Sequence, residues 1–381
     1  MKQIFYFIAL LLVFGCKSEK KEAKPTQQNT KSSSIDYAKG FTLKKTADDV
    51  TIIELTSPWP NAEASFTYAL VPKEKVGTIN LNKTNFDAII PVPINTVVLT
   101  STTHIPALEA LNELDKLTGF PDTEYISSKE ARKRIKNGQI IELGNNETIN
   151  TEMVISLQPD LVVGFGINAQ NRAYENIERS NIPVVYNGDW TEETPLGKAE
   201  WIKFFAPFFN KEKEAAQIFS DIEKNYLSAK QIAKSAPHRP TVLSGAMYKD
   251  VWYLPGGNSW AAQFINDANA DYLWKETTET GSLSLSWERV LQKAKNAEYW
   301  ISPSQFVSYE DMATSSEHYK QFDAFQNKKL YTFSSTVGET GGLLYYELAP
   351  QRPDLVLKDL IHILHPGLLP EYEPIFFKPL Q

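Results

Sequence analysis

The sequence predicts an α/β protein of two lobes, each with a central β-sheet flanked by helices, joined by one long backbone helix. Three observations lead to this fold class. Apolar β-branched runs alternate with helical patterns before residue 195, and the same alternation resumes after residue 236. Between them, residues 195–236 keep a helical pattern of Trp, Phe, Ile and Tyr that is long enough to connect two lobes.

The first fifteen residues have the pattern of a secretory signal peptide. Lys2 supplies a positive start, residues 4–14 are apolar, and Gly15 precedes Cys16. The apolar run is too short for an ordinary membrane span. Residues 13–16 resemble a bacterial lipobox, whose cysteine receives lipid and becomes the first residue of the mature protein. We expect removal of residues 1–15 and lipidation of Cys16; a plain cleaved signal with an incidental cysteine is the alternative.

Composition limits the class of protein further. Residues 16–40 are mostly Lys, Glu, Gln, Ser and Thr, which predicts a flexible tether. Because the chain has 1 cysteine, no intrachain disulfide can form and the core alone must hold the fold. The net charge of −7 argues against nucleic acid as a partner. No other stretch reaches the length of a spanning helix, so we expect the protein to meet the membrane only through its anchor. We also expect a monomer.

Residues 41–194 are predicted to form the N-terminal lobe. Residues 41–72 read as two β-branched runs around a Pro-Trp-Pro-Asn turn, which predicts a β-hairpin added to the lobe. Strands are expected at 96–100 and 161–166, with a helix over 106–118. Strands separated by helices favour parallel β-α-β units, whose ligand crevice lies beyond the carboxyl ends of the strands.

Residues 237–381 are predicted to form the C-terminal lobe, again with strands and helices in alternation. A weak internal repeat relates the two lobes: Glu152 and Glu288 each open a helical segment that runs into a strand. An acid at a helix N-terminus is favourable on electrostatic grounds alone, so a purely local role remains the alternative for both.

Several motifs together resemble one family. Residues 150–162 (Asn-Thr-Glu-Met-Val-Ile-Ser-Leu-Gln-Pro-Asp-Leu-Val), 254–260 (Leu-Pro-Gly-Gly-Asn-Ser-Trp) and 285–291 (Leu-Ser-Trp-Glu-Arg-Val-Leu) occur in the order found in helical-backbone (class III) periplasmic solute-binding proteins. That class serves ABC importers of iron-siderophores, haem and cobalamin. The resemblance covers residues 96–364. It implies that Glu152 and Glu288, one on each lobe, dock with arginines of the membrane permease.

Candidate ligand-binding residues follow from the expected strand ends. The first lobe contributes Ser101, Thr102, His104, Phe165 and Trp190, and the second contributes Tyr248, Trp252, Trp260 and the segment 334–346. Such a site is aromatic with hydroxyl groups and suits stacking on a macrocycle or catecholate rings. We expect no metal bound directly by protein side chains, because the histidines have no recognised ligand spacing.

The sequence therefore predicts a lipid-anchored binding protein on the periplasmic face of the envelope, which captures a ferric siderophore and delivers it to an ABC permease. Cobalamin is the alternative ligand, since few cations are available to meet an anionic chelate. A chelatase-like enzyme and an adhesive lipoprotein are rival classes. No hydrolase, zinc-protease, phosphate-binding or dinucleotide motif is present, so we expect neither an enzyme nor a resident cofactor.

Overall fold

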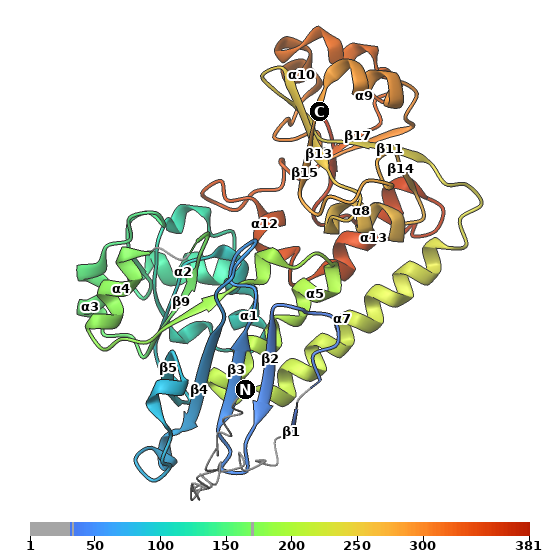
Figure 1. Ribbon diagram of the computed structural model, residues 1–381. Coiled ribbons are helices and arrows are strands. Elements are labelled where there is room, and N and C mark those ends of the chain that lie inside the picture. Colours follow the sequence, from blue (N-terminus) through green and yellow to red (C-terminus); the bar gives the residue numbers. More distant parts are fainter. Residues whose placement is uncertain (1–30, 33, 169–170) are drawn as a thin grey trace, which may run out of the picture.

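The computed structural model describes residues 31–32, 34–168 and 171–381 as two lobes placed along one long helix, α7 (Glu212–Ala233) (Figure 1). The two-lobed α/β fold is thereby confirmed. The expected signal peptide, Cys16 and residues 17–30 of the expected tether lie outside the described residues. Within the described part of the chain, no helix combines the length and the apolar character needed to cross a membrane.

The expected N-terminal hairpin is part of a larger sheet. Residues 41–72 form three strands that pair in antiparallel fashion. Residues 31–32 add a strand antiparallel to the first of them, and residues 88–92 add a strand parallel to the last, which makes five. In sheet order the strands are β1 (Lys31–Ser32), β2 (Phe41–Lys45), β3 (Thr51–Leu55), β4 (Phe66–Pro72) and β5 (Ala88–Val92).

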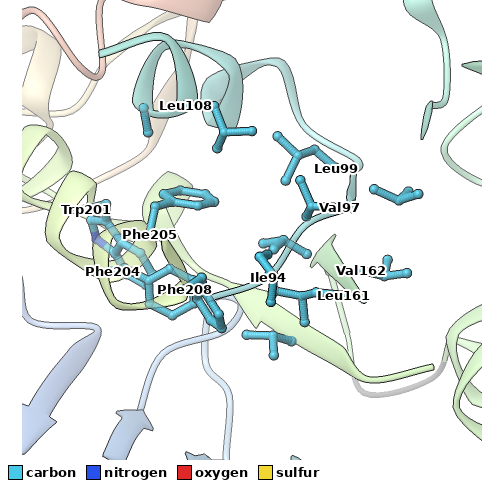
Figure 2. Packing of buried hydrophobic residues seen from close by; sticks show 14 of the residues in the cluster. Ile94, Val97, Leu99, Leu108, Leu161, Val162, Trp201, Phe204, Phe205 and Phe208 are labelled. Carbon is cyan, nitrogen blue, oxygen red and sulfur yellow. The ribbon is translucent and has the colours of Figure 1, made fainter. Parts of the chain in front are cut away.

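One face of this N-terminal sheet belongs to the core of the first lobe. Alternate residues of β2 and β3 are buried, as the period of a strand requires. Phe41 packs against Trp201 and Phe204 with ring centroids 4.6 and 5.6 Å apart. Figure 2 shows the same aromatic cluster meeting Val97, Leu99 and other strand residues of the first lobe. The sheet is therefore built into the lobe.

The first lobe is organised around a second, fully parallel sheet of order β10-β9-β6-β7-β8. Its strands are β6 (Val97–Leu99), β7 (Leu117–Phe120), β8 (Ile141–Glu142), β9 (Leu161–Phe165) and β10 (Val184–Asn187). Its helices are α1 (Ile105–Ala110), α2 (Lys129–Lys136), α3 (Thr151–Leu157) and α4 (Arg172–Arg179).

The helix expected over 106–118 is shorter than predicted, because residues 117–120 form strand β7. Gly119 lies within this strand, where a Cβ atom would come within 2.8 Å of the Leu143 side chain. The glycine thus permits close packing of a strand and does not end a helix.

The second lobe has a mostly parallel sheet of order β14-β11-β16-β17-β18 and a smaller antiparallel sheet of order β12-β13-β15. The strands are β11 (Thr241–Ser244), β12 (Ala246–Tyr248), β13 (Val251–Pro255), β14 (Asp271–Tyr272), β15 (Ser282–Ser286), β16 (Tyr299–Ile301), β17 (Leu330–Thr332) and β18 (Lys378–Pro379). The helices are α8 (Trp260–Asp267), α9 (Trp287–Ala294), α10 (Tyr309–Ser315), α11 (Asp323–Gln326), α12 (Leu344–Leu348) and α13 (Pro353–Leu364).

The segment predicted as one connecting helix, 195–236, is interrupted. It consists of α5 (Pro195–Glu200), α6 (Ile202–Phe205), a short 3₁₀ turn and then α7. Asn210 adopts a left-handed conformation (φ 57°) at the break before α7. The long helix itself serves both lobes, because Phe219 is buried in the first core and Tyr226 in the second.

The end of the expected tether is ordered. The backbone N–H groups of Asp36, Tyr37 and Ala38 donate to the buried Glu200 carboxylate, and that of Gly40 donates to Glu192. Buried carboxylates require such donors. Residues 36–40 are therefore fixed against α5, and the prediction of a flexible tether as far as residue 40 is wrong for this part.

A second connection between the lobes is made by residues 338–347, which we call the crossing segment. It leaves the second lobe after β17 and reaches the first lobe, so that α12 lies at the junction (Figure 1). The Glu347 carboxylate accepts hydrogen bonds from the backbone N–H groups of Ser127 (2.6 Å) and Ser128 (2.8 Å). At Gly342 a Cβ atom would lie 2.1 Å from the Tyr125 carbonyl oxygen, so only glycine fits there.

The Glu347 contact predicts a pH dependence of stability. Burial raises the pKa of Glu347 from its ordinary 4.5 to about 7, although the two N–H donors act in the opposite direction. The folded protein then binds this proton more tightly than the unfolded chain. The free energy of unfolding should therefore fall by about 3 kcal/mol as the pH rises from below 4.5 to above 7.

Urea denaturation of the wild type and of Glu347→Gln between pH 4.5 and pH 8 checks this expectation, with the glutamine variant showing a shallower decline. Glu339→Gln is the matched control on the same segment, because Lys136 lowers the pKa of Glu339 and takes its titration out of this range. Equal slopes for the wild type and Glu347→Gln would contradict the assignment.

Candidate functional site

A cleft between the two lobes contains two cavities, of about 450 and about 400 Å³. Tyr346, on the crossing segment, contributes to the walls of both, so the two cavities share this side chain as a common wall. The residue is 54% exposed, which leaves it accessible from the cleft. The two cavities together form the candidate site.

The first cavity lies beyond the carboxyl ends of parallel strands, as expected for a doubly wound sheet. Thr100 follows β6, Pro121 follows β7, and Phe165 ends β9. The structure places the predicted residues Ser101, Thr102 and Phe165 in this wall. The other described lining residues are Phe120, Asp122, Tyr125, Asn146, Gly341 and Leu343.

The second cavity is lined by hydroxyl groups and aromatic rings of the second lobe. The predicted residues Tyr248 and Trp260 both belong to its wall. Phe333 and Tyr345 form its base as a stacked pair with ring centroids 4.3 Å apart. Hydroxyl groups come from Ser244, Ser259, Thr280, Ser282, Ser302 and Ser304.

Three predicted ligand residues are not in either wall. Trp252 is fully buried in the second core, where it stacks on Trp300 at 5.2 Å and donates its Nε1–H to the Ser244 carbonyl. Trp190 packs behind Phe165, with ring centroids 5.4 Å apart. His104 is also fully buried and lies against Phe205. These side chains support the cleft from behind.

A buried polar layer lies beneath the cleft. The Lys198 ammonium donates to the carbonyl oxygens of Asp189 and Trp190, both at 3.1 Å, and lies 5.1 Å from the ring centroid of Trp260. Burial lowers the pKa of Lys198, against the opposing effect of Asp189. Burial also lowers the pKa of His104, which favours its neutral form. Lys198 thus links α5, the loop after β10 and an aromatic wall of the second lobe.

The described residues offer no direct metal site. No three His, Cys, Asp or Glu side chains converge within them. The aromatic rings and hydroxyl groups of the cavity walls are suited to the surface of an organic ligand, because rings stack on flat groups and hydroxyls both donate and accept hydrogen bonds.

Asp122 and Asn146 are wall residues that sequence reasoning missed. Asp122 lies two residues after β7, a strand hidden by the helix expected over 106–118. Recognition of residues 117–120 as a β-strand would have placed Pro121 and Asp122 at a strand end. Tyr346, in contrast, falls within the segment 334–346 that was expected to contribute to the cleft.

Glu152 and Glu288 lie outside the cleft, in the first turns of α3 and α9. Both side chains are exposed, one on each lobe. Hydrogen bonds from its own backbone amide and from Ser286 lower the pKa of Glu288, which keeps this side chain ionised. The geometry leaves both carboxylates available to a partner, and permease docking remains a prediction.

Two α/β lobes with one long helix between them are the architecture expected of the solute-binding class. Residues 97–337 match the family model described as periplasmic binding protein, and the chain belongs to this family. The resemblance to the helical-backbone class, made from the motifs around Glu152, Trp260 and Glu288, is thereby confirmed. The family and fold are those of substrate-binding transport proteins.

The chain is similar to two uncharacterized lipoproteins of Methanocaldococcus jannaschii. One is 29% identical over 80% of this chain and 72% of its own length. The other is 22% identical over 95% of this chain and 94% of its own length. Among solved structures, CeuE of Helicobacter pylori with Ni(II) bound has a TM-score of 0.55 at 17% identity, covering 74% of this chain and 88% of its own. The periplasmic haem-binding protein HutB of Vibrio cholerae has a TM-score of 0.53 at 15% identity, and the match covers 69% of this chain and 99% of HutB. At these identities the structures show a shared fold.

The position of Trp252 generates a prediction about stability. Trp252→Ala should lower the free energy of unfolding by about 3–5 kcal/mol, because a fully buried indole is replaced by a cavity. Tyr248→Ala is the control on the same small sheet, since Tyr248 is 68% exposed and should change stability by less than about 0.5 kcal/mol. Urea denaturation measures both. A Trp252→Ala protein as stable as the control would place the indole outside the core.

Proposed function

We propose that this protein captures a ferric siderophore between its lobes and delivers it to the permease of an ABC importer. The observation that carries the proposal is the pair of cavities that share Tyr346, one lined by aromatic and hydroxyl groups of the first lobe and the other by those of the second lobe. Membership of the periplasmic binding protein family supports a transport role. Cobalamin is the second candidate, favoured by a wall that is almost free of charge.

The form of the cleft supports a bulky, rigid ligand. The cavities on either side of Tyr346 can hold two parts of one molecule, while Trp260 and Phe165 offer ring faces from opposite lobes. A ferric chelate presents organic groups around a metal that needs no protein ligand.

We further propose that the mature protein is a monomer held on the periplasmic face of the envelope by lipid on Cys16. The sequence Val-Phe-Gly-Cys at residues 13–16 motivates the anchor. The curated relatives named as lipoproteins support the same location. In this arrangement Glu152 and Glu288 meet the permease, since acids on separate lobes fix the orientation of docking.

Titration of the mature protein with ferric siderophores, haem and cobalamins tests ligand capture through its tryptophan fluorescence. We expect saturable quenching by one ligand class at micromolar to nanomolar dissociation constants, or about −8 to −12 kcal/mol. Trp260→Phe should lose part of the quenching because Trp260 lines the cavity. Trp287→Phe, on α9 away from both cavity walls, is the control. Absence of quenching by every ligand, with calorimetry equally silent, would refute the proposal.

Docking is tested by combining Glu152→Ala with Glu288→Ala. The double variant should bind ligand as the wild type does, while transport into proteoliposomes that contain the importer falls by about tenfold or more, because docking loses both charges. Glu130→Ala combined with Glu310→Ala is the matched control, since these acids also occupy first helical turns, one on each lobe. Normal transport by the Glu152/Glu288 variant would show that these acids do not dock.

A further inference from the structure

The walls of the cleft are almost without charge, and the charge that is present is negative. Among the described residues that line the two cavities there is no Lys, Arg or His, and Asp122 is the one acidic side chain. Two lysines lie next to the walls. The Lys249 ammonium lies 5.5 Å from the ring centroid of Tyr248. The buried Lys198 ammonium lies 5.1 Å from the ring centroid of Trp260.

Asp122 is held in one orientation by the surrounding loops. Its Oδ2 accepts the backbone N–H of Asn146 at 2.8 Å, and its own N–H donates to the Gly144 carbonyl at 2.6 Å. The Asn146 amide in turn donates to the Thr100 carbonyl at 2.8 Å. The carboxylate is thereby attached to the loops after β6 and β8, and its place in the cavity wall is preorganised.

In the part of the chain that the structure describes, this carboxylate has no cationic partner. Within the described residues, no Lys, Arg or His nitrogen lies within 4.0 Å of Asp122. Its local hydrogen bonds do not require a charge, because the oxygen of an asparagine side chain would accept the same Asn146 N–H. Asparagine also tolerates the left-handed backbone of this residue (φ 50°). The negative charge is therefore a property of the cleft that the loop structure alone does not demand.

We propose that the cleft selects metal chelates without net negative charge, and that Asp122 is the residue that determines this preference. The proposal rests on the proposed function and narrows its ligand class to neutral or cationic complexes. A carboxylate in a partly enclosed site repels an anionic chelate more strongly than it would in open water. The ring faces of Tyr346 and Trp260 act in the same direction, since aromatic faces attract cations.

The aromatic hydroxyl at the centre of the cleft is consistent with this selection. A phenol with its ordinary pKa near 10 is protonated at neutral pH, and partial burial raises the pKa of Tyr346 further, so this side chain adds no negative charge of its own. It can therefore donate a hydrogen bond to the oxygen atoms of a neutral chelate. Asp122 and Tyr346 line the same cavity, so both can contact one bound molecule.

The test compares chelates of different charge on the full-length mature protein. The probes are a monocationic ferric trihydroxamate, a neutral ferric trihydroxamate, a neutral corrinoid and a trianionic ferric tris-catecholate, titrated by calorimetry at low and at physiological salt. We expect measurable binding of a cationic or neutral probe and binding of the trianionic probe at least about tenfold weaker. Tight binding of the trianionic probe by the wild type would overturn the proposal without the use of any variant.

Asp122→Asn should reduce the preference for the cationic over the anionic probe by about tenfold, with an unchanged thermal midpoint. Glu124→Gln is the matched control, because it removes an equal charge from the same loop at an exposed residue outside the wall. An unchanged preference in Asp122→Asn would overturn the role of this residue. If no probe of any charge binds the wild type, the proposed function fails and the charge preference fails with it.

Discussion

The cleft depends on one contact between the lobes, in which the Glu347 carboxylate accepts hydrogen bonds from the backbone N–H groups of Ser127 and Ser128. Without it, the crossing segment would keep its hydrogen bonds from Ser127 Oγ to Gly342 and from Thr340 to Glu124, but it would lose its most deeply buried polar contact with the first lobe. The hydrogen bonds of Glu347 attach the end of the crossing segment to Ser127 and Ser128. Tyr346, next to Glu347, is thereby held in the wall shared by both cavities. A carboxylate is costly to bury, and its two N–H partners offset part of that cost. The wall of the binding site is thus set by a polar contact between parts of the chain more than 200 residues apart.

Much of the architecture is readable from local patterns. β-branched runs such as 161–165 and the long apolar stripe of α7 have periods that identify a strand and a helix without tertiary information. The N-terminal sheet and strand β7 were not recoverable in this way. Whether residues 41–72 stand alone or join a lobe depends on contacts with Trp201 and Phe204, far along the chain. The short run around Gly119 suits either a helix end or a tightly packed strand, and only the Leu143 side chain decides between them.

In the candidate site, too, some residues could be placed from local sequence patterns and others only from tertiary contacts. Ser101, Thr102 and Phe165 could be placed because parallel strands bring their carboxyl ends to one edge. Trp252 was misplaced because an aromatic residue on a two-residue period gives no sign of which face is buried; it points into the core, whereas its neighbour Tyr253 is 43% exposed. Glu347 could not be predicted as a link between the lobes, because its partners are backbone N–H groups, which almost every residue type has.

The shared helix α7 also affects how the protein unfolds. Ala215, Phe219 and Ile222 complete one core, and Tyr226, Ala229 and Ala233 complete the other, along a single uninterrupted stretch of backbone hydrogen bonds. Fraying of either lobe removes a wall from its neighbour, so the two lobes melt together although each has its own sheets. Cooperativity of this kind protects a protein that has a single cysteine and so no intrachain disulfide, because the partly open forms that proteases attack are rarely populated.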